Sequence, residues 1–532
     1  MMKLLIVYLL LFLFISTCTA NNHHNTFNFE QNDEPDIKKS DFPDGFLFGS
    51  ATSAYQIEGA YLEDAKSLST WDVFCHSETG CGKSGGNGDI ADDHYHLFLN
   101  DIELIHSLGV QAYRFSISWS RILPRGRFGE VNPAGIIFYN KIIDNLISKG
   151  IEPFVTLQHV EFPQELEDRY GGWLYPEMQE QFLHLAEVCF KSFGDKVKHW
   201  ITFNEPKLFA DSAYGDGTIP PGRCSEPFGN CHDGNSDVEP IIAMHHILLA
   251  HGRVAKLYHE NFQPKQGGLI GLSVHCYMYE PLTDSDLDRE AAKRAFAFNT
   301  GWELDPTIFG HYPEEIQKYV GSELPSFSLE EKNFMKSSID FIGLNHYSTI
   351  YVKDCTNSSC SATANRAITG FVDTVGERDG VPIGELTGAE KSYVVPRGMD
   401  EIVSLIKIRY NNKPMFITEN GYSSPDLQEK RVNELSNDVK RVEYHKKYLA
   451  SLAKSIRKGA DVRGYFIWTL MDSYEWLKGY NVRYGLHYVD RETLTRIPKL
   501  SARWYKNFLT NTSDFISKFA SRDNSSLQKD VM

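Results

Sequence analysis

The segment Pro414-Met415-Phe416-Ile417-Thr418-Glu419-Asn420-Gly421 has the pattern of a buried strand that ends in a turn. Three consecutive apolar residues predict the strand, and Asn420-Gly421 is a strong turn signal. Glu419 stands where the strand gives way to the turn. A buried carboxylate is costly unless it is paired or protonated. Glu419 is therefore either an ordinary solvated loop residue or one member of a functional pair.

Seven further apolar runs have the same strand-like character: Phe46–Ile57, Ala112–Trp119, Glu152–His159, His199–Pro206, Gly268–Tyr279, Asp340–Ser348 and Val462–Leu470. Apolar residues at helical spacing predict helices between them, at Asp93–Leu108, Ile137–Ser148, Met178–Phe193 and Ile241–Tyr258. Strands that alternate with helices predict parallel β/α units, and eight strands close a TIM barrel. We therefore expect an α/β protein, a single (β/α)8 barrel with long βα loops. The alternative is a doubly wound open sheet, but no Gly-x-Gly-x-x-Gly follows the first strand.

The chain has 532 residues and a formal net charge of −16, which argues against a nucleic-acid or anionic-membrane partner. It begins with Met1-Met2-Lys3, an apolar run from Leu4 to Ile15, and small residues up to Ala20. This pattern predicts a signal peptide at 1–20, and the apolar run is shorter than the roughly 20 residues of a membrane span. We expect a flexible leader at 21–40, the barrel at 41–512 and a flexible tail at 513–532. The expected location is the secretory pathway, either the apoplast or the vacuole.

Six cysteines form three close pairs in Gly/Ser/Asn-rich segments: Cys75 with Cys81, Cys224 with Cys231, and Cys355 with Cys360. In an oxidising compartment such pairs predict loop disulfides, and their spacing does not match a zinc site. Cys189 and Cys276 lie in apolar surroundings and are expected to be core thiols. Sequons at Asn357, Asn511 and Asn524 are candidate glycosylation sites. We expect neither a metal nor a cofactor.

Polar and aromatic residues gather at the same end of almost every predicted strand. They are Gln56 and Glu58, Arg114, His159, Asn204 and Glu205, Asn345 to Tyr347, Glu419, and Trp468 with Asp472, Glu475 and Trp476 beyond it. In a parallel barrel these ends meet, so the coincidence predicts a pocket. His245, His246 and His251 fall in a predicted helix instead, where packing or solvent is expected to satisfy them.

Glu205 and Glu419 end the fourth and seventh strands, which face each other across an eight-stranded barrel. Two carboxyl groups that flank a pocket suit cleavage of a glycosidic bond, where one donates a proton and the other attacks as an ion. Arg114 and Tyr347 are candidates to keep one carboxylate charged, and an apolar setting would raise the pKa of the other. Metal-dependent hydrolysis is the weaker alternative, because no ligand spacing supports it.

The sequence resembles glycoside hydrolase family 1, the retaining β-glycosidases, from about Asp41 to Leu509. The matching motifs, in the family's order, are Phe46–Ala60, Tyr113–Trp119, Thr202–Pro206, Phe341–Tyr347, Ile417–Gly421 and Trp468–Leu486. The loop Pro220–Ser225, closed at Cys231, resembles the plant branch of the family.

The resemblance implies a role for each site residue. Glu205 would be the general acid/base and Glu419 the nucleophile, oriented by Arg114 and Tyr347. The sugar hydroxyls would be bound by Gln56, His159, Asn204, Glu475 and Trp476, with Trp468 as a stacking floor and Tyr484 near the sugar C6. Three departures concern the sugar site: Val160-Glu161 in place of the usual Trp-Asp, Ser473-Tyr474 in place of Asn-Phe, and Tyr484 in place of Phe.

The expected function is a β-glucosidase that hydrolyses O-linked β-glucosides of plant secondary metabolites. Thioglucoside-cleaving relatives carry Gln at the position of Glu205, so the glutamate favours O-glycosides. A transglucosidase that uses acyl-glucose is one alternative, and a non-catalytic sugar-binding protein is another. The expected partner is a small-molecule glucoside. The sequence leaves open the aglycone, the sugar preference and the oligomeric state.

Overall fold

The computed structural model describes residues 36–510, except 78–79, 82–85, 358 and 427–430. The predicted signal peptide, most of the predicted leader, the tail, and the sequons at Asn511 and Asn524 lie outside the described residues. The elements described below all belong to one unit that begins at Ile37. Among the described residues, every helix is too short or too polar to cross a lipid bilayer.

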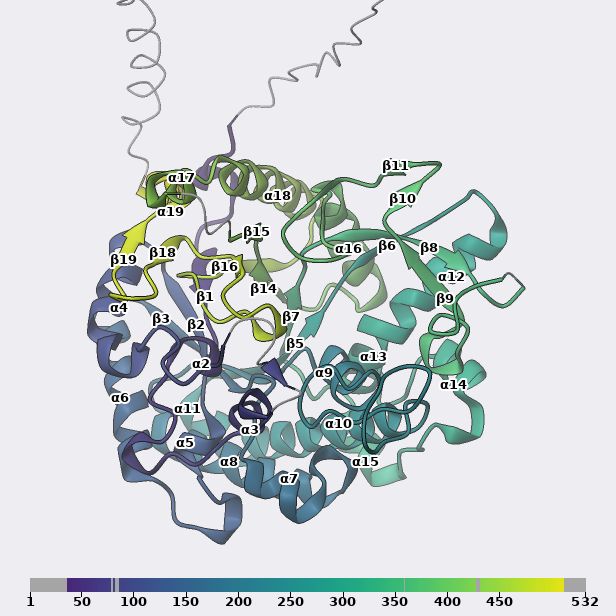
Figure 1. Ribbon diagram of the computed structural model, residues 1–532, viewed down its shortest axis with the longest axis horizontal. Coiled ribbons are helices and arrows are strands. Elements are labelled where there is room, and N and C mark those ends of the chain that lie inside the picture. Colours follow the sequence, from purple (N-terminus) through teal and green to yellow (C-terminus); the bar gives the residue numbers. More distant parts are fainter. Residues whose placement is uncertain (1–35, 78–79, 82–85, 358, 427–430, 511–532) are drawn as a thin grey trace, which may run out of the picture. The chain divides into compact units, whose positions relative to one another are not determined.

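Eight parallel strands form a closed barrel in the order β1-β16-β14-β7-β5-β4-β3-β2 (Figure 1). They are β1 (Leu47–Ala51), β2 (Ala112–Ser116), β3 (Glu152–Gln158), β4 (His199–Asn204), β5 (Leu269–His275), β7 (Phe341–Asn345), β14 (Met415–Asn420) and β16 (Val462–Trp468). Each strand lies within one of the eight predicted apolar runs. The predicted (β/α)8 barrel is therefore confirmed, and the open sheet is wrong.

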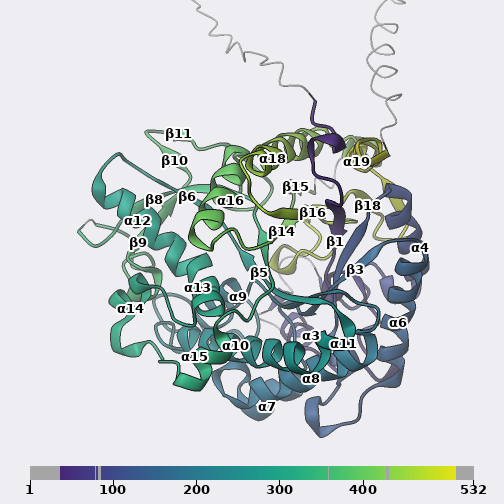
Figure 2. The ribbon, with the colours of Figure 1, turned by 180° about the vertical axis from the view of Figure 1, so that it is seen from behind.

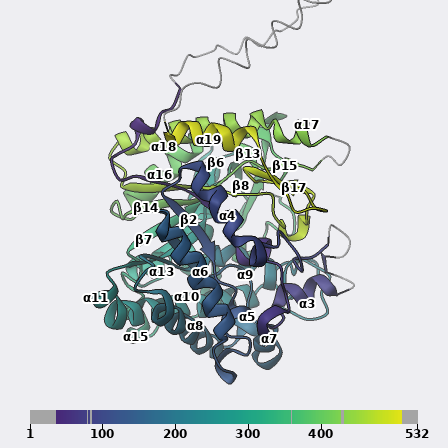
Figure 3. The same cartoon turned by 90° about the vertical axis from the view of Figure 1, so that its left-hand side faces the viewer.

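Helices surround the barrel, as the opposite views of Figures 1 and 2 show. The longer ones are α4 (His94–Leu108), α6 (Pro133–Ser148), α8 (Glu177–Phe193), α10 (Glu239–Leu257), α12 (Asp286–Phe296), α16 (Arg397–Arg409), α18 (Val439–Arg457) and α19 (Leu500–Thr510). The shorter ones are α2 (Ala54–Ile57), α3 (Thr70–His76), α5 (Trp119–Ile122), α7 (Gln164–Tyr170), α9 (Pro206–Tyr214), α11 (Gln263–Gln266), α13 (Trp302–Phe309), α14 (Glu314–Val320), α15 (Leu329–Met335) and α17 (Val432–Ser436). In the side view of Figure 3, α18 and α19 lie along one edge and α8 and α15 near the opposite edge. All four helices predicted from apolar spacing are present.

Helix α6 illustrates how the sequence specifies these elements. Asn132 is its N-cap and accepts a hydrogen bond from the Ala134 N–H, while Pro133 occupies the first helical turn, where a missing N–H costs nothing. The buried residues Phe138, Tyr139, Ile142, Ile143 and Leu146 recur at helical spacing and pack toward the barrel.

A layer of aromatic side chains fills the barrel interior below the site. Phe154, Phe341, Phe416 and Phe466 are at most 2% exposed and belong to one cluster. The ring of Phe416 lies 5.2 Å from those of both Phe154 and Phe341. Trp468, the last residue of β16, belongs to the same cluster. The interior is thus packed, and space for a ligand remains only at the carboxyl ends of the strands.

All eight predicted strands are longer than the observed ones, and the difference is largest for the first and the fifth. The run Phe46–Ile57 forms β1 only as far as Ala51, and Gln56 lies in the short helix α2 rather than on a strand. Ser116 Oγ accepts the Ala54 N–H at 2.7 Å, and it thereby satisfies an N–H at the start of α2 that has no partner within the helix. Similarly, β5 ends at His275, and the chain continues in β6 (Met278–Pro281).

Short strands outside the barrel shape its loops. β6 joins β8 (Thr349–Asp354) and β9 (Val372–Val375), and four two-stranded sheets pair β10 (Glu377–Arg378) with β11 (Val381–Pro382), β12 (Glu385–Leu386) with β13 (Tyr393–Val394), β15 (Ser424–Pro425) with β17 (Val482–Arg483), and β18 (His487–Val489) with β19 (Arg496–Pro498). The three predicted disulfides, Cys75–Cys81, Cys224–Cys231 and Cys355–Cys360, are all formed. Cys189 and Cys276 are free and buried, as expected.

The helical histidines are held by neighbouring groups, as predicted. His245 Nδ1 lies 2.8 Å from Tyr312 Oη, and His251 Nδ1 lies 2.7 Å from Thr202 Oγ1. His246 Nδ1 lies 2.9 Å from the carbonyl oxygen of Trp173.

Candidate active site

A cavity of about 350 Å³ opens at the carboxyl ends of the barrel strands. Its walls include nine of the eleven predicted catalytic and substrate-binding residues: His159, Asn204, Glu205, Tyr347, Glu419, Trp468, Glu475, Trp476 and Tyr484. The other two, Gln56 and Arg114, are buried behind the wall and contact residues that form it. The structure therefore brings the whole predicted set together.

Glu419 is a buried cavity carboxylate with a buried cationic partner. Arg114 Nη1 donates to Glu419 Oε1 at 2.5 Å, and Tyr347 Oη donates to Glu419 Oε2 at 2.7 Å. Arg114 is 1% exposed, so solvent does not screen this ion pair. Each oxygen of the Glu419 carboxylate thus has its own fixed donor.

Glu205 has a neutral partner instead. Asn345 Nδ2 donates to Glu205 Oε1 at 2.9 Å, and no cation forms an ion pair with Glu205 among the described residues. Its backbone is left-handed, with a φ of 49°, and its N–H donates to the Ser273 carbonyl oxygen at 2.8 Å. Left-handed backbone is unfavourable for residues other than glycine and is found preferentially at functional sites. This turn separates β4 from α9 and lets the side chain enter the cavity.

Three side chains connect the two carboxyl groups. Asn345 Nδ2 donates both to Glu205 and to Asn204 Oδ1, the latter at 2.9 Å. Arg114 Nη2 donates to the same Asn204 oxygen at 2.6 Å. The hydrogen-bonded path therefore runs from Glu205 through Asn345, Asn204 and Arg114 to Glu419.

Burial dominates the acidity of both groups. It raises the pKa of Glu205 to about 7, against the weaker opposing effects of Asn345 and Arg114. It also raises the pKa of Glu419 to about 7, although Arg114 and Tyr347 lower it as the sequence led us to expect. The two carboxyl groups differ in their partners, since of the two only Glu419 is in contact with a cation. A negative charge on one carboxyl group also raises the pKa of the other.

A second group of polar side chains forms the wall around Glu475. Gln56 Nε2 donates to the Tyr474 carbonyl oxygen at 2.7 Å and to Glu475 Oε2 at 3.4 Å. Ser473 Oγ donates to Glu475 Oε1 at 3.1 Å, so one of the departures from the family pattern contacts this carboxyl directly. Burial raises the pKa of Glu475 well above its usual range. Such a group can both accept and donate hydrogen bonds to vicinal hydroxyls.

Aromatic faces form the rest of the inner wall. The His159 ring is stacked with Trp468 at 5.7 Å and with Trp476 at 5.9 Å. Burial lowers the pKa of His159 well below its ordinary value, so the ring is neutral. Its Nε2 lies 3.1 Å from Asn204 Nδ2, and its Nδ1 has no hydrogen-bond partner within the described part of the chain. Flat indole faces beside polar edges suit a pyranose ring.

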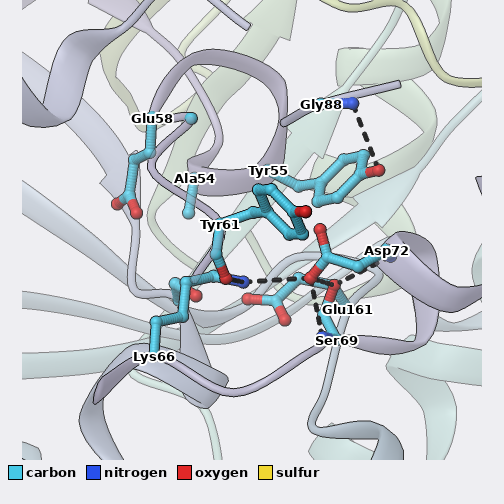
Figure 4. A pocket seen from close by; sticks show the side chains of 11 residues that line it. Ala54, Tyr55, Glu58, Tyr61, Lys66, Ser69, Asp72, Gly88 and Glu161 are labelled. Atoms are coloured by element: carbon cyan, nitrogen blue, oxygen red, sulfur yellow. Dashed lines mark hydrogen bonds and ion pairs between the residues drawn. The ribbon is translucent and has the colours of Figure 1, made fainter. Parts of the chain in front are cut away.

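Val160 and Glu161, which replace the family's usual Trp-Asp, lie in two different places. Val160 lines the main cavity with its backbone in the left-handed region (φ 65°), and its carbonyl oxygen accepts the Trp71 Nε1–H at 3.2 Å. Trp71 also lines the cavity, so an indole from α3 stands beside Val160. Glu161 faces a separate polar cavity of about 10 Å³, beside the Lys66–Asp72 ion pair (Figure 4). Glu161 therefore has no access to the main cavity.

Several cavity residues were not predicted from the sequence. Trp71 comes from a loop helix and gave no strand-end signal. His275 and Tyr277 follow β5 and line the cavity. Asn345, by contrast, is one of the predicted strand-end residues; it had no assigned role, and it contacts Glu205 from behind the cavity wall. The strand-end criterion would have identified His275 and Tyr277 if it had been applied to the fifth strand.

A parallel eight-stranded barrel with two buried carboxyl groups and a polar, indole-lined cavity at its carboxyl end defines a barrel glycoside hydrolase. The family model for glycosyl hydrolase family 1 matches residues 38–514, and the chain belongs to this family.

Similar proteins agree with this classification. The chain is 53% identical, over 93% of its length and 95% of the relative's, to a protein of Oryza sativa subsp. japonica named "Probable inactive beta-glucosidase 14". It is 47% identical to the coniferin beta-glucosidase of Pinus contorta, over 89% of this chain and 93% of the relative. The crystal structure of the rice beta-glucosidase Os3BGlu6 has a TM-score of 0.86 at 43% identity, over 89% of this chain and 99% of that one. The beta-glucosidase of Trichoderma harzianum has a TM-score of 0.82 at 39% identity, over 88% of this chain and 98% of that one.

Proposed function

We propose that the protein is a retaining β-glucosidase that hydrolyses O-linked β-glucosides through a covalent glycosyl-enzyme. The observation that carries the proposal is the difference between the two carboxyl groups. Glu419 is held by a buried arginine and a tyrosine, which suits an anionic nucleophile. Glu205 is buried and contacts a neutral amide, which suits a proton donor.

In the first step the Glu205 carboxyl donates its proton to the glycosidic oxygen, and a Glu419 oxygen attacks the anomeric carbon. The bond from the anomeric carbon to the aglycone breaks, and the aglycone leaves as an alcohol or phenol. In the second step the Glu205 carboxylate takes a proton from water, whose oxygen attacks the same carbon from the opposite face to the ester bond. Glu419 is released as a carboxylate, and two inversions give net retention.

The remaining wall residues would bind the glucosyl unit. Glu475 and His159 line the cavity with polar atoms that could meet the hydroxyls, Gln56 holds Glu475 from behind the wall, and Trp468 offers a flat apolar face. The rest of the lining combines the apolar side chains of Leu208, Phe209, Ile219, Leu477 and Val482 with the polar or charged ones of Ser212, Thr218, Glu390, Ser392 and Lys478. The apolar part of this lining suits contact with an apolar or aromatic aglycone, which supports plant secondary-metabolite glucosides as substrates.

Two assays test this proposal. The first is a panel of p-nitrophenyl β-glycosides that differ only in the sugar, where the glucoside is expected to have the highest kcat/KM. The second fixes glucose and varies the aglycone, with coniferin included because one relative is named for it. Absence of glucose release from every β-glucoside, with the chain folded, would overturn the proposal.

Two alternative functions can be distinguished from hydrolysis with the same purified protein. An acyl-glucose-dependent transglucosidase uses the same covalent intermediate, and it would yield transfer product rather than free glucose when a flavonoid acceptor is present. The second alternative is a sugar-binding protein without catalysis, and the word "inactive" in the name of the 53%-identical relative makes it worth testing. This chain keeps both carboxyl groups and their partners, which favours an active enzyme.

A location in the secretory route, apoplast or vacuole, is proposed on the predicted signal peptide and the three disulfides. Asn357 is exposed and lies within the Cys355–Cys360 loop, where a glycan could be attached. Endoglycosidase treatment of the protein from a plant host tests this site.

A further inference from the structure

The first turn of α9 is capped by a side chain from another helix. Glu303, in the first turn of α13, accepts the Lys207 backbone N–H through Oε1 at 2.8 Å. Its other oxygen is buried and has no hydrogen-bond partner among the described residues. Glu303 is fully buried, and no ion pair to it is found in the described part of the chain. Burying a carboxyl group with one unpaired oxygen costs free energy, so its presence at this position calls for a structural or functional explanation.

The position of Glu205 explains why Glu303 caps α9. Glu205 is the N-cap residue of α9, and an N-cap side chain ordinarily accepts a hydrogen bond from the N–H two or three residues later. Glu205 makes no such bond, because its carboxyl group is in the cavity and contacts Asn345. Lys207 is two residues after Glu205, so its N–H is the group that this cap would have satisfied. Glu303 takes over the bond.

A second contact joins the same two helices. The Lys207 ammonium lies 4.9 Å from the centre of the Trp302 ring, and it also pairs with Asp211 at 2.5 Å. Adjacent residues of α13 therefore hold the backbone and the side chain of one α9 residue. A π-helical turn, Ala297–Gly301, directly precedes Trp302, and such turns are frequent at functional sites.

We propose that Glu303 is a positioning residue for Glu205: it caps α9 in place of Glu205 and thereby leaves the Glu205 carboxyl free to serve the reaction. This inference rests on the proposed role of Glu205 as the acid/base. The strained turn at Glu205 is then stabilised from both sides, by Ser273 through the Glu205 N–H and by Glu303 through the Lys207 N–H.

The charge of Glu303 is consistent with this role. Burial raises the pKa of Glu303 well above its usual range, the charges of Glu205 and Asp211 raise it further, and Lys207 opposes them through its N–H and its charge. A neutral carboxyl accepts the Lys207 N–H through its carbonyl oxygen. It also adds no negative charge that would make Glu205 harder to ionise in the second step.

The experiment compares Glu303→Gln, which keeps a neutral oxygen acceptor, with Glu303→Met, which keeps the length and removes it. Each variant is assayed with phenyl β-glucoside, whose leaving group needs a proton, and with 2,4-dinitrophenyl β-glucoside, whose leaving group does not. General-acid catalysis contributes roughly 10²–10⁴-fold, so a misplaced acid should lose a measurable part of that factor. We expect Glu303→Met to lose about tenfold or more in kcat/KM with the phenyl substrate and less than about threefold with the dinitrophenyl substrate. Glu303→Gln should stay within about threefold of the wild type with both.

A matched control separates positioning from stability. Asp305 is a buried carboxyl group on the same helix, and it binds Arg409 and Tyr410 instead of α9. Asp305→Asn should lower the melting temperature and slow both substrates equally. Equal losses on both substrates in Glu303→Met, or none, would overturn the inference.

Hydrogen exchange at the Lys207 amide gives a readout that needs no activity. The amide should exchange at least about tenfold faster in Glu303→Met than in the wild type or Glu303→Gln, and unchanged exchange would contradict the cap. A wild type that cleaves neither glucoside would overturn the proposed function and, with it, the catalytic half of this inference. A wild type that cleaves both, with unaltered discrimination in Glu303→Met, would overturn the inference alone.

Discussion

Arg114 Nη1 lies 2.5 Å from Glu419 Oε1, and the same guanidinium reaches Asn204 Oδ1 through Nη2 at 2.6 Å. One rigid cation therefore fixes both the carboxylate that ends β14 and the residue next to Glu205 on the chain. A planar fork with two donors imposes this geometry, which a single ammonium group cannot reproduce. Arg114 is thus the link in the hydrogen-bonded path that joins Glu419 to the Asn204–Asn345 pair beside Glu205.

Arg114→Lys should retain the positive charge but lose the planar pair of donors that bind Glu419 and Asn204. We expect kcat/KM for p-nitrophenyl glucoside to fall by roughly 10²–10³-fold, the size of effect seen when one preorganised charge-stabilising donor is removed. The acid limb of the pH profile should move to higher pH, because Glu419 loses part of the interaction that lowers its pKa. Arg121→Lys is the matched control: Arg121 is also fully buried and pairs with Glu58 at 3.0 Å, away from the main cavity. An equal loss of activity in the control would contradict a specific role for Arg114.

Tyr347→Phe removes one of the two donors to Glu419 and little else. The expected result is a fall of about 10–100-fold in kcat, with a smaller upward shift of the acid limb than in Arg114→Lys. Tyr484→Phe serves as the comparison, since Tyr484 lines the same cavity and its ring lies 6.1 Å from that of Tyr347. That variant should change KM and sugar preference while the acid limb stays in place. If the acid limb shifted in Tyr484→Phe but not in Tyr347→Phe, the tyrosine that lowers the pKa of Glu419 would be Tyr484 and not Tyr347.

The pH dependence of kcat/KM follows from the two raised pKa values, both about 7. The active form has Glu419 ionised and Glu205 protonated. The rate therefore rises with pH as Glu419 loses its proton and falls as Glu205 loses its own. Because the groups are coupled, the two apparent values belong to the pair, and we expect one limb on each side of pH 7. The basic limb should be absent with 2,4-dinitrophenyl glucoside; its persistence there would show that it does not report the acid.

The sequence predicted the barrel because each barrel strand is a dense apolar run followed by polar residues. It placed Glu205, Glu419, Arg114 and Tyr347 correctly because all four lie on or directly after such strands. It predicted Gln56 on a strand, whereas the chain enters α2 after β1, with Ser116 accepting an N–H at the start of that helix.

Pairings between distant loop or helix residues could not be predicted in this way. Glu303 and Lys207 are 96 positions apart, and neither has a pattern that points to the other. Trp71 lines the cavity from a loop helix, and its Nε1–H donates to the carbonyl oxygen of Val160, 89 positions along the chain. Such contacts depend on how loops pack, which apolar periodicity does not encode.

Asp472 anchors the loop that carries Glu475 and Tyr484. It accepts hydrogen bonds from Lys499 Nζ at 2.6 Å, from the Gly485 N–H at 2.9 Å and from Arg483 Nη1 at 3.1 Å. Asp472→Asn should lower the free energy of unfolding by about 3–5 kcal/mol, because it leaves the buried Lys499 without its ion-pair partner and Arg483 with Asp426 alone. Asp461→Asn, which breaks an exposed pair with Arg463, should change it by less than about 1 kcal/mol. Urea denaturation followed by tryptophan fluorescence measures both.

The contribution of Asp472 has a defined pH window. Although burial alone would raise it, Lys499 and Arg483 lower the pKa of Asp472 below the ordinary value of an aspartate. The folded pKa is below the unfolded one, so the stabilisation is complete above the unfolded value and is lost as pH falls through the folded one. The gap in stability between wild type and Asp472→Asn should therefore narrow at low pH, and a gap that widened there would contradict the ion-pair account.

The central claim, that Glu419 forms a covalent bond to the sugar, is tested most directly by trapping the glycosyl-enzyme. The protein is incubated with 2,4-dinitrophenyl 2-deoxy-2-fluoro-β-glucoside, whose intermediate hydrolyses slowly, and is then digested and analysed by mass spectrometry. The account predicts one added fluoroglucosyl unit, on the peptide that contains Glu419, together with loss of activity. Label on any other residue, or turnover of a β-glucoside by Glu419→Gly without an added nucleophile, would contradict it.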